Sequence, residues 1–367
     1  MTTPGALPYR AALEEYEQEA EALLAALRAR EREAAWRFRW AHPRFHGRSV
    51  TEVGETELGA ADARWVIARE HGFEDWDQLA TFAHAVNADA DVRRFEAAVE
   101  AVVSGDLPVL RSMLREHPDL VTARSSRRHH ATLLHYIGAN GVENGRQRTP
   151  ENAVEVCRLL LDGGAEADAL ADMYDARCTT LSMLISSTPP AEAGLQAALA
   201  ETLLDYGAAL EGPGSQWQSS VMTALTFGFG RTAEVLARRG GPLEKLAVAA
   251  GLGRVEETKR LLRSADAASR HAAFALAAQH GRADIVRLLL EAGEDPNRFN
   301  PKGLHSHSTP LHQAVWADHG DVVRMLVEAG ARLDLRDEVY HATPLGWALH
   351  GGRERIAGYL RERGAPK

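Results

Sequence analysis

Two ten-residue stretches, DIVRLLLEAG (284–293) and DVVRMLVEAG (321–330), decide the fold class of this 367-residue chain. They align without a gap at a spacing of 37 residues. Apolar residues at positions i, i+3 and i+4 line one face of a helix, and the closing glycine suits the left-handed backbone of a helix C-cap. The pattern therefore predicts repeated amphipathic helices that each end at a glycine.

The pattern returns along most of the chain. It reads EVCRLLLDGG at 155–164 and ETLLDYG at 201–207, and weaker copies lie at 235–240 and 359–364. Self-similarity of this kind is the sequence signature of a repeat architecture. We count eight units, which close near Pro118, Gly164, Gly207, Gly240, Ala265, Gly293, Gly330 and Gly364.

A second motif precedes these helices: TPLHQA at 309–314, TPLGWA at 343–348 and a looser TLLH at 132–135. Threonine caps a helix, and proline fits its first turn, where no N–H partner is needed. The motifs resemble the T-P-L-H-x-A opening of ankyrin repeats, over residues 93–365. The resemblance implies an all-α ankyrin-repeat solenoid, with insertions in two of its eight helix-pair units and histidines that brace neighbouring loops.

The first 92 residues follow a different pattern and are expected to form a separate helical segment, the leader, ahead of a repeat domain at 93–367. Helical periodicity runs over 9–42, about 60–71 and 77–86. The stretch 62–76 looks like a leader element that precedes ankyrin repeats in many bacterial proteins, which implies a bacterial type of ankyrin protein. Because the first unit of a solenoid must be shielded from water, we expect the leader to cap the repeats.

Composition narrows the function. The formal net charge is −9, and there is no apolar stretch of the roughly 20 residues that a membrane-spanning helix needs. The N-terminus lacks the basic and apolar regions of a secretory signal, and two cysteines cannot build a disulfide framework. We therefore expect a cytoplasmic protein with no membrane contact and no cofactor.

Unusual residues gather at the loop tips between units and in the first helices. Aromatic, arginine and histidine side chains at one rim are typical of binding hot spots. Together with the ankyrin resemblance, they predict non-catalytic recognition of a protein or peptide on the concave face and loop tips. The candidate binding residues are Arg127, Arg128, His129, His130, Tyr174, Asp175, Arg177, Trp217, His305, His307, Trp316, Tyr340, His341 and Trp347.

The alternative is an enzyme or small-molecule-binding protein with a pocket between the loop tips of units two to four. Its acid–base candidates would be Asp172, Tyr174, Asp175 and His130, beside a long insertion at 141–150. A closed, buried acidic pocket there would favour the enzyme, whereas an open groove with exposed aromatics would favour the binder. The loop histidines could supply metal ligands, but the His-x-His at 305–307 has no third ligand at a known distance, so we predict no metal site.

A basic and aromatic stretch at 36–48, WRFRWAHPRFHGR, is a further candidate, for nucleic acid. Arginines interleaved with aromatics can pair with phosphates and stack on bases. However, Trp36 and Trp40 are four residues apart and share one helix face, which we expect to pack inward. Nucleic acid is therefore not an expected partner.

Overall fold

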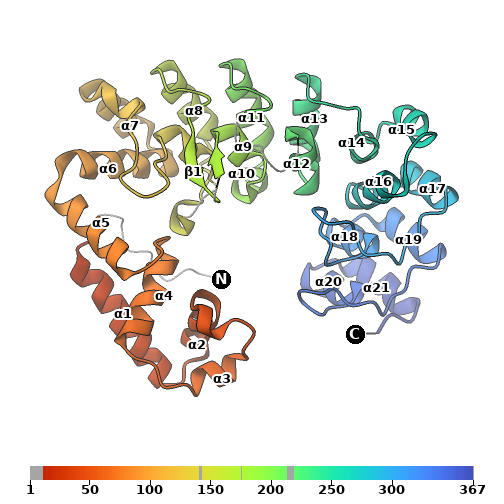
Figure 1. The fold of residues 1–367 in the computed structure, drawn as a ribbon, viewed down its shortest axis with the longest axis horizontal. Helices are drawn as coiled ribbons and strands as arrows, with labels where there is room; N and C mark the ends of the chain where they lie inside the picture. The colour runs from red at the N-terminus through yellow and green to blue at the C-terminus, as the bar shows by residue number, and fades with distance from the viewer. Residues whose placement is uncertain (1–10, 140–142, 175, 213–218, 367) are drawn as a thin grey trace. The chain divides into compact units, whose positions relative to one another are not determined.

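The computed structural model describes residues 11–139, 143–174, 176–212 and 219–366, apart from the side chain of Asn144. It divides into two compact units, residues 1–214 (unit 1) and 215–367 (unit 2). Figure 1 shows that helices make up most of both units. Of the helices described, none has the length and apolar character needed to cross a bilayer.

The leader is helical and has a core of its own, formed by buried residues between Ala11 and Val86. The predicted helix over 9–42 is interrupted, because Arg30 has a positive φ of 62° and separates two helices. The leader elements are α1 (Leu13–Arg28), α2 (Arg32–Ala41), the 3-10 helix η1 (Pro43–Phe45), α3 (Val50–Gly54), α4 (Ala60–Glu70) and α5 (Trp76–Ala88). The boundary at residue 92 stays a prediction.

The expectation that Trp36 and Trp40 pack inward is wrong. Their side chains are 38% and 75% exposed. The buried face of α2 is formed by Ala34, Ala35 and Phe38. At 100° per residue, the two tryptophans fall on the opposite side of the helix. Four-residue spacing correctly placed them on one face, but it does not show which face meets the core.

Unit 1 continues with three helix pairs after the leader. The second pair opens with a 3-10 helix, and the third is preceded by a short antiparallel hairpin in which Asp172 pairs with Arg177. The elements are α6 (Ala90–Ser104), α7 (Leu107–Glu116), η2 (Pro118–Val121), η3 (Leu133–Gly138), η4 (Asn144–Arg146), α8 (Ala153–Asp162), β1 (Ala171–Met173), β2 (Ala176–Cys178), α9 (Thr180–Leu184), α10 (Thr188–Glu192) and α11 (Gln196–Asp205).

Unit 2 holds five helix pairs, so the described residues contain the eight pairs predicted from the repeats. They are α12 (Ser220–Thr226) and α13 (Gly230–Arg238), α14 (Leu246–Leu252) and α15 (Val255–Leu262), α16 (Ala267–Gln279) and α17 (Ala283–Glu291), α18 (Pro310–Trp316) and α19 (Gly320–Glu328), and α20 (Pro344–His350) and α21 (Glu354–Glu362). Buried apolar side chains from α14 to α21 form one continuous core. The fold is an all-α solenoid.

The repeated motifs explain why successive pairs keep their register. In the TPLH motif, the Nδ1 atom of His312 accepts from the Thr309 hydroxyl at 2.8 Å. The Nε2 atom of His312 donates to the Ala342 carbonyl of the next repeat at 3.2 Å. His135 makes the same contacts, with Thr132 at 2.9 Å and the Cys178 carbonyl at 3.3 Å. These bonds confirm the predicted bracing role of the two histidines.

Candidate functional site

Five of the predicted binding residues come together on unit 2. They form, with His350, a continuous group of rings that we name the aromatic patch: His305, His307, Trp316, Tyr340, Trp347 and His350. Two loop tips and two first helices, α18 and α20, supply these side chains. Residues that lie 30 to 40 positions apart in the sequence thus meet, because each repeat presents its tip and first helix on the same side of the stack.

Trp347 is the hub of the aromatic patch. It is only 9% exposed, and the rings of Trp316 and Tyr340 contact it edge-on at centroid distances of 6.0 and 6.4 Å. His307 lies 6.0 Å from the same ring. By contrast, Trp316 is 46% and Tyr340 71% exposed. A buried ring therefore supports two aromatic side chains that face solvent.

A buried carboxylate holds the Tyr340 loop in place. Asp337 is 1% exposed, and its oxygens accept from the backbone N–H groups of Val339 (2.9 Å), Tyr340 (2.6 Å) and Ala342 (3.0 Å). Its Oδ2 also accepts from the indole Nε1 of Trp347 at 3.0 Å. Burial acts to raise the pKa of Asp337, but these donors outweigh it and hold the pKa below its ordinary value. The backbone of the Tyr340 loop is thus held in place by the Asp337 carboxylate.

The chemistry of the aromatic patch suits recognition rather than reaction. Exposed tryptophan and tyrosine rings on a rigid base offer a large contact area at little cost in side-chain entropy. Arginine lies at the border, where Arg353 donates to the Trp316 carbonyl and Arg336 to the His341 carbonyl. His305 uses its Nε2 to bond the Thr226 carbonyl at 2.8 Å. Among the described residues, no three His, Cys, Asp or Glu side chains gather as metal ligands.

The corresponding tip in unit 1 corrects part of the prediction. Arg127 and His129 were expected at an exposed rim, but they are 5% and 3% exposed. The guanidinium group of Arg127 donates to the carbonyls of His71 and Gly72 in the leader, at 2.8 and 3.2 Å. It also lies 4.2 Å from the centre of the Phe73 ring. Both side chains are therefore internal, and neither is presented to a partner.

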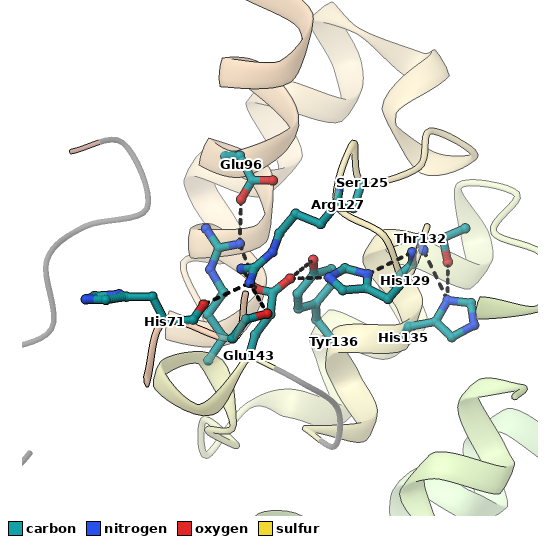
Figure 2. Close-up of polar contacts among 12 residues, drawn as sticks. His71, Glu96, Ser125, Arg127, His129, Thr132, His135, Tyr136 and Glu143 are labelled. Carbon is teal, nitrogen blue, oxygen red and sulfur yellow. Dashed lines mark hydrogen bonds and ion pairs between the residues drawn. The ribbon is translucent and has the colours of Figure 1, made fainter. Parts of the chain in front are cut away.

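Glu143 is the acceptor on which this buried cluster converges (Figure 2). Its carboxylate pairs with Arg127 at 3.1 Å and Arg146 at 3.1 Å, and it accepts from Tyr136 at 2.9 Å. His129 accepts the Ala131 N–H at its Nδ1, so the proton on its Nε2 is donated to Glu143. Two arginines, a histidine and a tyrosine thus surround one carboxylate from the insertion between η3 and α8.

Arg146 connects the cluster to the first helix pair. It pairs with Glu96 and with Glu100, both on α6. Burial acts to raise the pKa of Glu143, but Arg127, Arg146 and His129 outweigh it and hold the pKa well below the ordinary value. Burial raises the pKa of Glu96, which Arg146 only partly offsets. The ion pairs of Arg146 with Glu96, Glu100 and Glu143 therefore connect the insertion to helix α6.

The cavity beside this cluster is too small for a substrate. It measures about 20 Å³ and is lined by Tyr136, Glu143, Met173 and Met183, among others. A volume of about 10–15 Å³ is needed for one water molecule. Glu143 is also a poor general base, because its low pKa and its cationic partners stabilise the ionised form. Within the described residues, the cavity beside Glu143 therefore does not support the alternative of an active site.

The remaining predicted residues are spread along the tips. Exposed side chains outside the aromatic patch are those of Arg128, His130, Asp172, Tyr174, Arg177 and His341. Arg128 pairs with Glu74 of the leader, and Arg177 lies 3.8 Å from Asp172 on the hairpin. Asp172 is exposed beside Arg177, so it is not the desolvated carboxylate that acid–base catalysis requires. Partial burial of Tyr174 raises the pKa of its hydroxyl. Asp175 and Trp217 lie outside the described residues.

Sequence reasoning missed the residues that support these tips. Glu143 and Arg146 lie in an insertion with no repeat pattern, so no periodicity indicated their burial. Asp337 was missed for another reason, since a lone aspartate in a loop gives no sign of its backbone partners. A usable signal did exist for His350, which lies three residues after Trp347 on the same helix and so shares part of its face.

Comparisons with known proteins agree with the repeats. A family described as ankyrin repeats (3 copies) matches residues 246–337. Human cyclin-dependent kinase 4 inhibitor B is 36% identical over 126 residues, 33% of this chain and 88% of the relative. Human cyclin-dependent kinase inhibitor 2A is 34% identical over 120 residues, 32% of this chain and 74% of the relative.

A solved structure, the human ASB11 ankyrin repeat domain, aligns with 65% of this chain and all of its own length, at 21% identity and a TM-score of 0.31. The relatives named above come from a eukaryote, so the predicted bacterial type has no support from them. The identity and coverage of these relatives, together with the repeat motifs and their helix pairs, show that the chain belongs to the ankyrin-repeat family.

Proposed function

We propose that this protein recognises a protein or peptide partner through the aromatic patch of unit 2, without catalysing a reaction. The observation that carries the proposal is the exposure of Trp316 and Tyr340 around the buried ring of Trp347. Hot spots of protein interfaces are enriched in tryptophan, tyrosine and arginine that rest on a well-packed base. Arg336 and Arg353, at the border, complete that composition.

The relatives support the same class of function. Two of them are named as inhibitors of cyclin-dependent kinases, and thus as proteins that act on another protein. By analogy, the repeats of this chain would act by binding. The analogy extends to the mode of action alone, because a fold does not specify its partner.

The test is a partner capture from extract of the source cells, followed by affinity measurements on the purified pair. The bait chains are the wild type, Trp316→Ala with Tyr340→Ala, and Tyr174→Ala as a matched control. Tyr174 is an exposed aromatic of unit 1, 52% accessible, and lies outside the patch. Loss of a hot-spot side chain costs about 2 kcal/mol or more, which is roughly a 30-fold weaker Kd for each substitution.

Full binding by the double variant would exclude the patch as the recognition surface. Weaker binding by Tyr174→Ala alone would instead place the surface on unit 1. Circular dichroism of each variant checks the fold, which we expect to be retained because both patch residues project into solvent.

We also propose that the leader caps the first repeat. Arg93 of α6 joins the leader to the first repeat, because it donates to the carbonyls of Val86 and Asn87 at 3.1 and 2.6 Å. Arg127, in the tip before η3, adds a link from the second repeat to the carbonyls of His71 and Gly72. Replacement of Arg93 by alanine removes the link from the first repeat alone. We expect faster amide exchange in α5 of that variant, and unchanged exchange would argue against capping.

A further inference from the structure

The two exposed tryptophans of α2 form a platform that the proposed function does not use. The rings of Trp36 and Trp40 lie nearly parallel, at an interplanar angle of 22° and a centroid distance of 6.3 Å. The guanidinium carbon of Arg39 lies 5.1 Å from the centre of the Trp36 ring. We name the three side chains the tryptophan platform.

Contacts of the neighbouring residues on α2 hold the platform in position. Phe38 is fully buried in the leader core, and its neighbour Arg37 donates to Glu70 at 2.6 Å. The Nε of Arg39 donates to the Arg48 carbonyl at 2.6 Å, which ties the following loop to the helix. The tryptophans are therefore presented on a fixed helix, yet Trp40 keeps 75% of its surface open. Exposure on a braced support favours a surface that receives a flat ligand.

The sequence around the platform is basic. Between residues 28 and 48 there are seven arginines and two glutamates, Glu31 and Glu33. Four of these arginines are exposed and form no ion pair within the described part of the chain: Arg28, Arg30, Arg32 and Arg48. Arg32 lies one helical turn before Trp36, on the flank that Arg39 also occupies. Unit 1 as a whole has 21 Lys and Arg against 34 Asp and Glu, so this basic surface is local.

We propose that the tryptophan platform binds single-stranded nucleic acid. An unpaired base stacks on the open face of the Trp40 ring, and the neighbouring arginines pair with the phosphates on either side. Aromatic stacking combined with arginine contacts is the way in which proteins hold single strands without reading their sequence. A duplex would fit poorly, because its bases are already stacked on one another.

The alternative occupants are less well matched to these residues. A peptide partner would leave the exposed arginines without phosphate-like acceptors unless it were strongly acidic. An anionic membrane surface would pair with the arginines, but a pair of rings offers little apolar area for insertion. The proposal stands apart from recognition through unit 2, since the residues involved belong to different units.

The test uses the full chain and a fluorescein-labelled 15-nucleotide thymidine strand, with anisotropy measured between 20 and 200 mM salt. We expect binding that weakens with salt, with a log–log slope near −2 if about three phosphates are neutralised. Trp40→Ala should weaken binding by about 10-fold, within the range for loss of one stacked base. Phe227→Ala, which removes an exposed aromatic ring of unit 2 outside the aromatic patch, is the control and should bind like the wild type.

A second variant separates the charges from the rings. Arg32→Ser with Arg48→Ser should make the salt slope shallower by about 1.4, because each phosphate contact on a single strand contributes about 0.7. An absence of binding at 20 mM salt would overturn the proposal, as would equal affinity of the wild type and Trp40→Ala. Trp40-dependent binding to phosphatidylserine vesicles but not to the oligonucleotide would overturn it in favour of a lipid surface.

Discussion

The tip that precedes η3 in unit 1 and the tip that precedes α20 in unit 2 occupy equivalent places in their repeats. They differ in whether their side chains are buried or exposed. In unit 1, Arg127 and His129 are buried around Glu143. In unit 2, Tyr340 stays 71% exposed above Trp347. Both tips are organised by one buried carboxylate, Glu143 or Asp337. They differ in what that carboxylate binds.

This difference has a physical origin. Asp337 accepts mainly from backbone N–H groups of its own loop, so it shapes the loop and leaves the side chains outside. Glu143 comes from an insertion and accepts from charged side chains of other elements, so it draws those side chains inward. A residue type at a loop tip therefore indicates a binding surface only if no neighbouring segment supplies its counter-charge.

The largest effect is expected from Glu143→Gln, which keeps the shape of the side chain and removes its charge. Arg127 and Arg146 would keep their buried charges with one counter-ion fewer. Breaking a buried ion pair costs about 3–5 kcal/mol, so we expect a loss of that order in the free energy of unfolding of unit 1. Denaturant unfolding measures it. Asp172→Asn, an exposed carboxylate, is the control, and equal losses for both variants would show that the cluster is not a structural centre.

A smaller effect is expected from Asp337→Ala in unit 2. The substitution leaves the N–H groups of Tyr340 and Ala342 and the indole of Trp347 without their acceptor. We expect a loss of about 2–3 kcal/mol in the free energy of unfolding, together with weaker partner binding. Asp334→Ala serves as control, because its ion pair with Arg332 is exposed. Stability unchanged by Asp337→Ala would mean that the loop does not depend on the carboxylate.

The bracing histidines should respond to acid alike in both units. Burial lowers the pKa of His135 and of His312 from 6.5 to about 4. The unfolded chain therefore binds a proton at each site before the folded chain does, and stability is lost as the pH falls from 6.5 towards 4. At pH 5 each histidine accounts for about 2 kcal/mol. His312→Gln should reduce the drop in stability between pH 7 and pH 5 by that amount, and an unaltered pH profile would contradict the assignment.

The smallest effects on stability are expected from the exposed side chains. Tyr340→Ala and Arg128→Ala should each change the free energy of unfolding by no more than about 0.5 kcal/mol. The two differ in binding, since only Tyr340 belongs to the aromatic patch. Thermal unfolding of both variants, beside the affinity of the captured partner, distinguishes a binding residue from a structural one. A large loss of stability in Tyr340→Ala would mean that its loop is part of the core.

The fold could be predicted from the sequence because the same helix-pair pattern recurs in successive repeats. Apolar spacing, the TPLH motifs and the closing glycines each point to the same helix pairs, and Gly293 and Gly330 do adopt a φ of +90°. The sequence predicts His305, His307, Trp316, Tyr340 and Trp347 at loop tips and first helices of neighbouring repeats, and equivalent positions of neighbouring repeats lie next to one another in a solenoid. A sequence pattern that recurs once per repeat thus predicts where its residues lie in the stack.

What could not be predicted depends on single contacts outside the repeat. The burial of Arg127 required knowledge of Glu143 and of two carbonyls in the leader. The exposure of Trp40 required knowledge of which face of α2 meets the core, a choice that Ala34, Ala35 and Phe38 decide together. Periodicity places residues on a shared face, whereas long-range partners determine whether that face is covered.

The most direct test is hydrogen–deuterium exchange of the chain with and without its captured partner. If the aromatic patch is the recognition surface, backbone amides of residues 305–316 and 336–350 will be protected in the complex, while those of 125–131 and 171–178 will exchange as in the free chain. Protection confined to 125–131 and 171–178 would contradict that assignment and place recognition on unit 1.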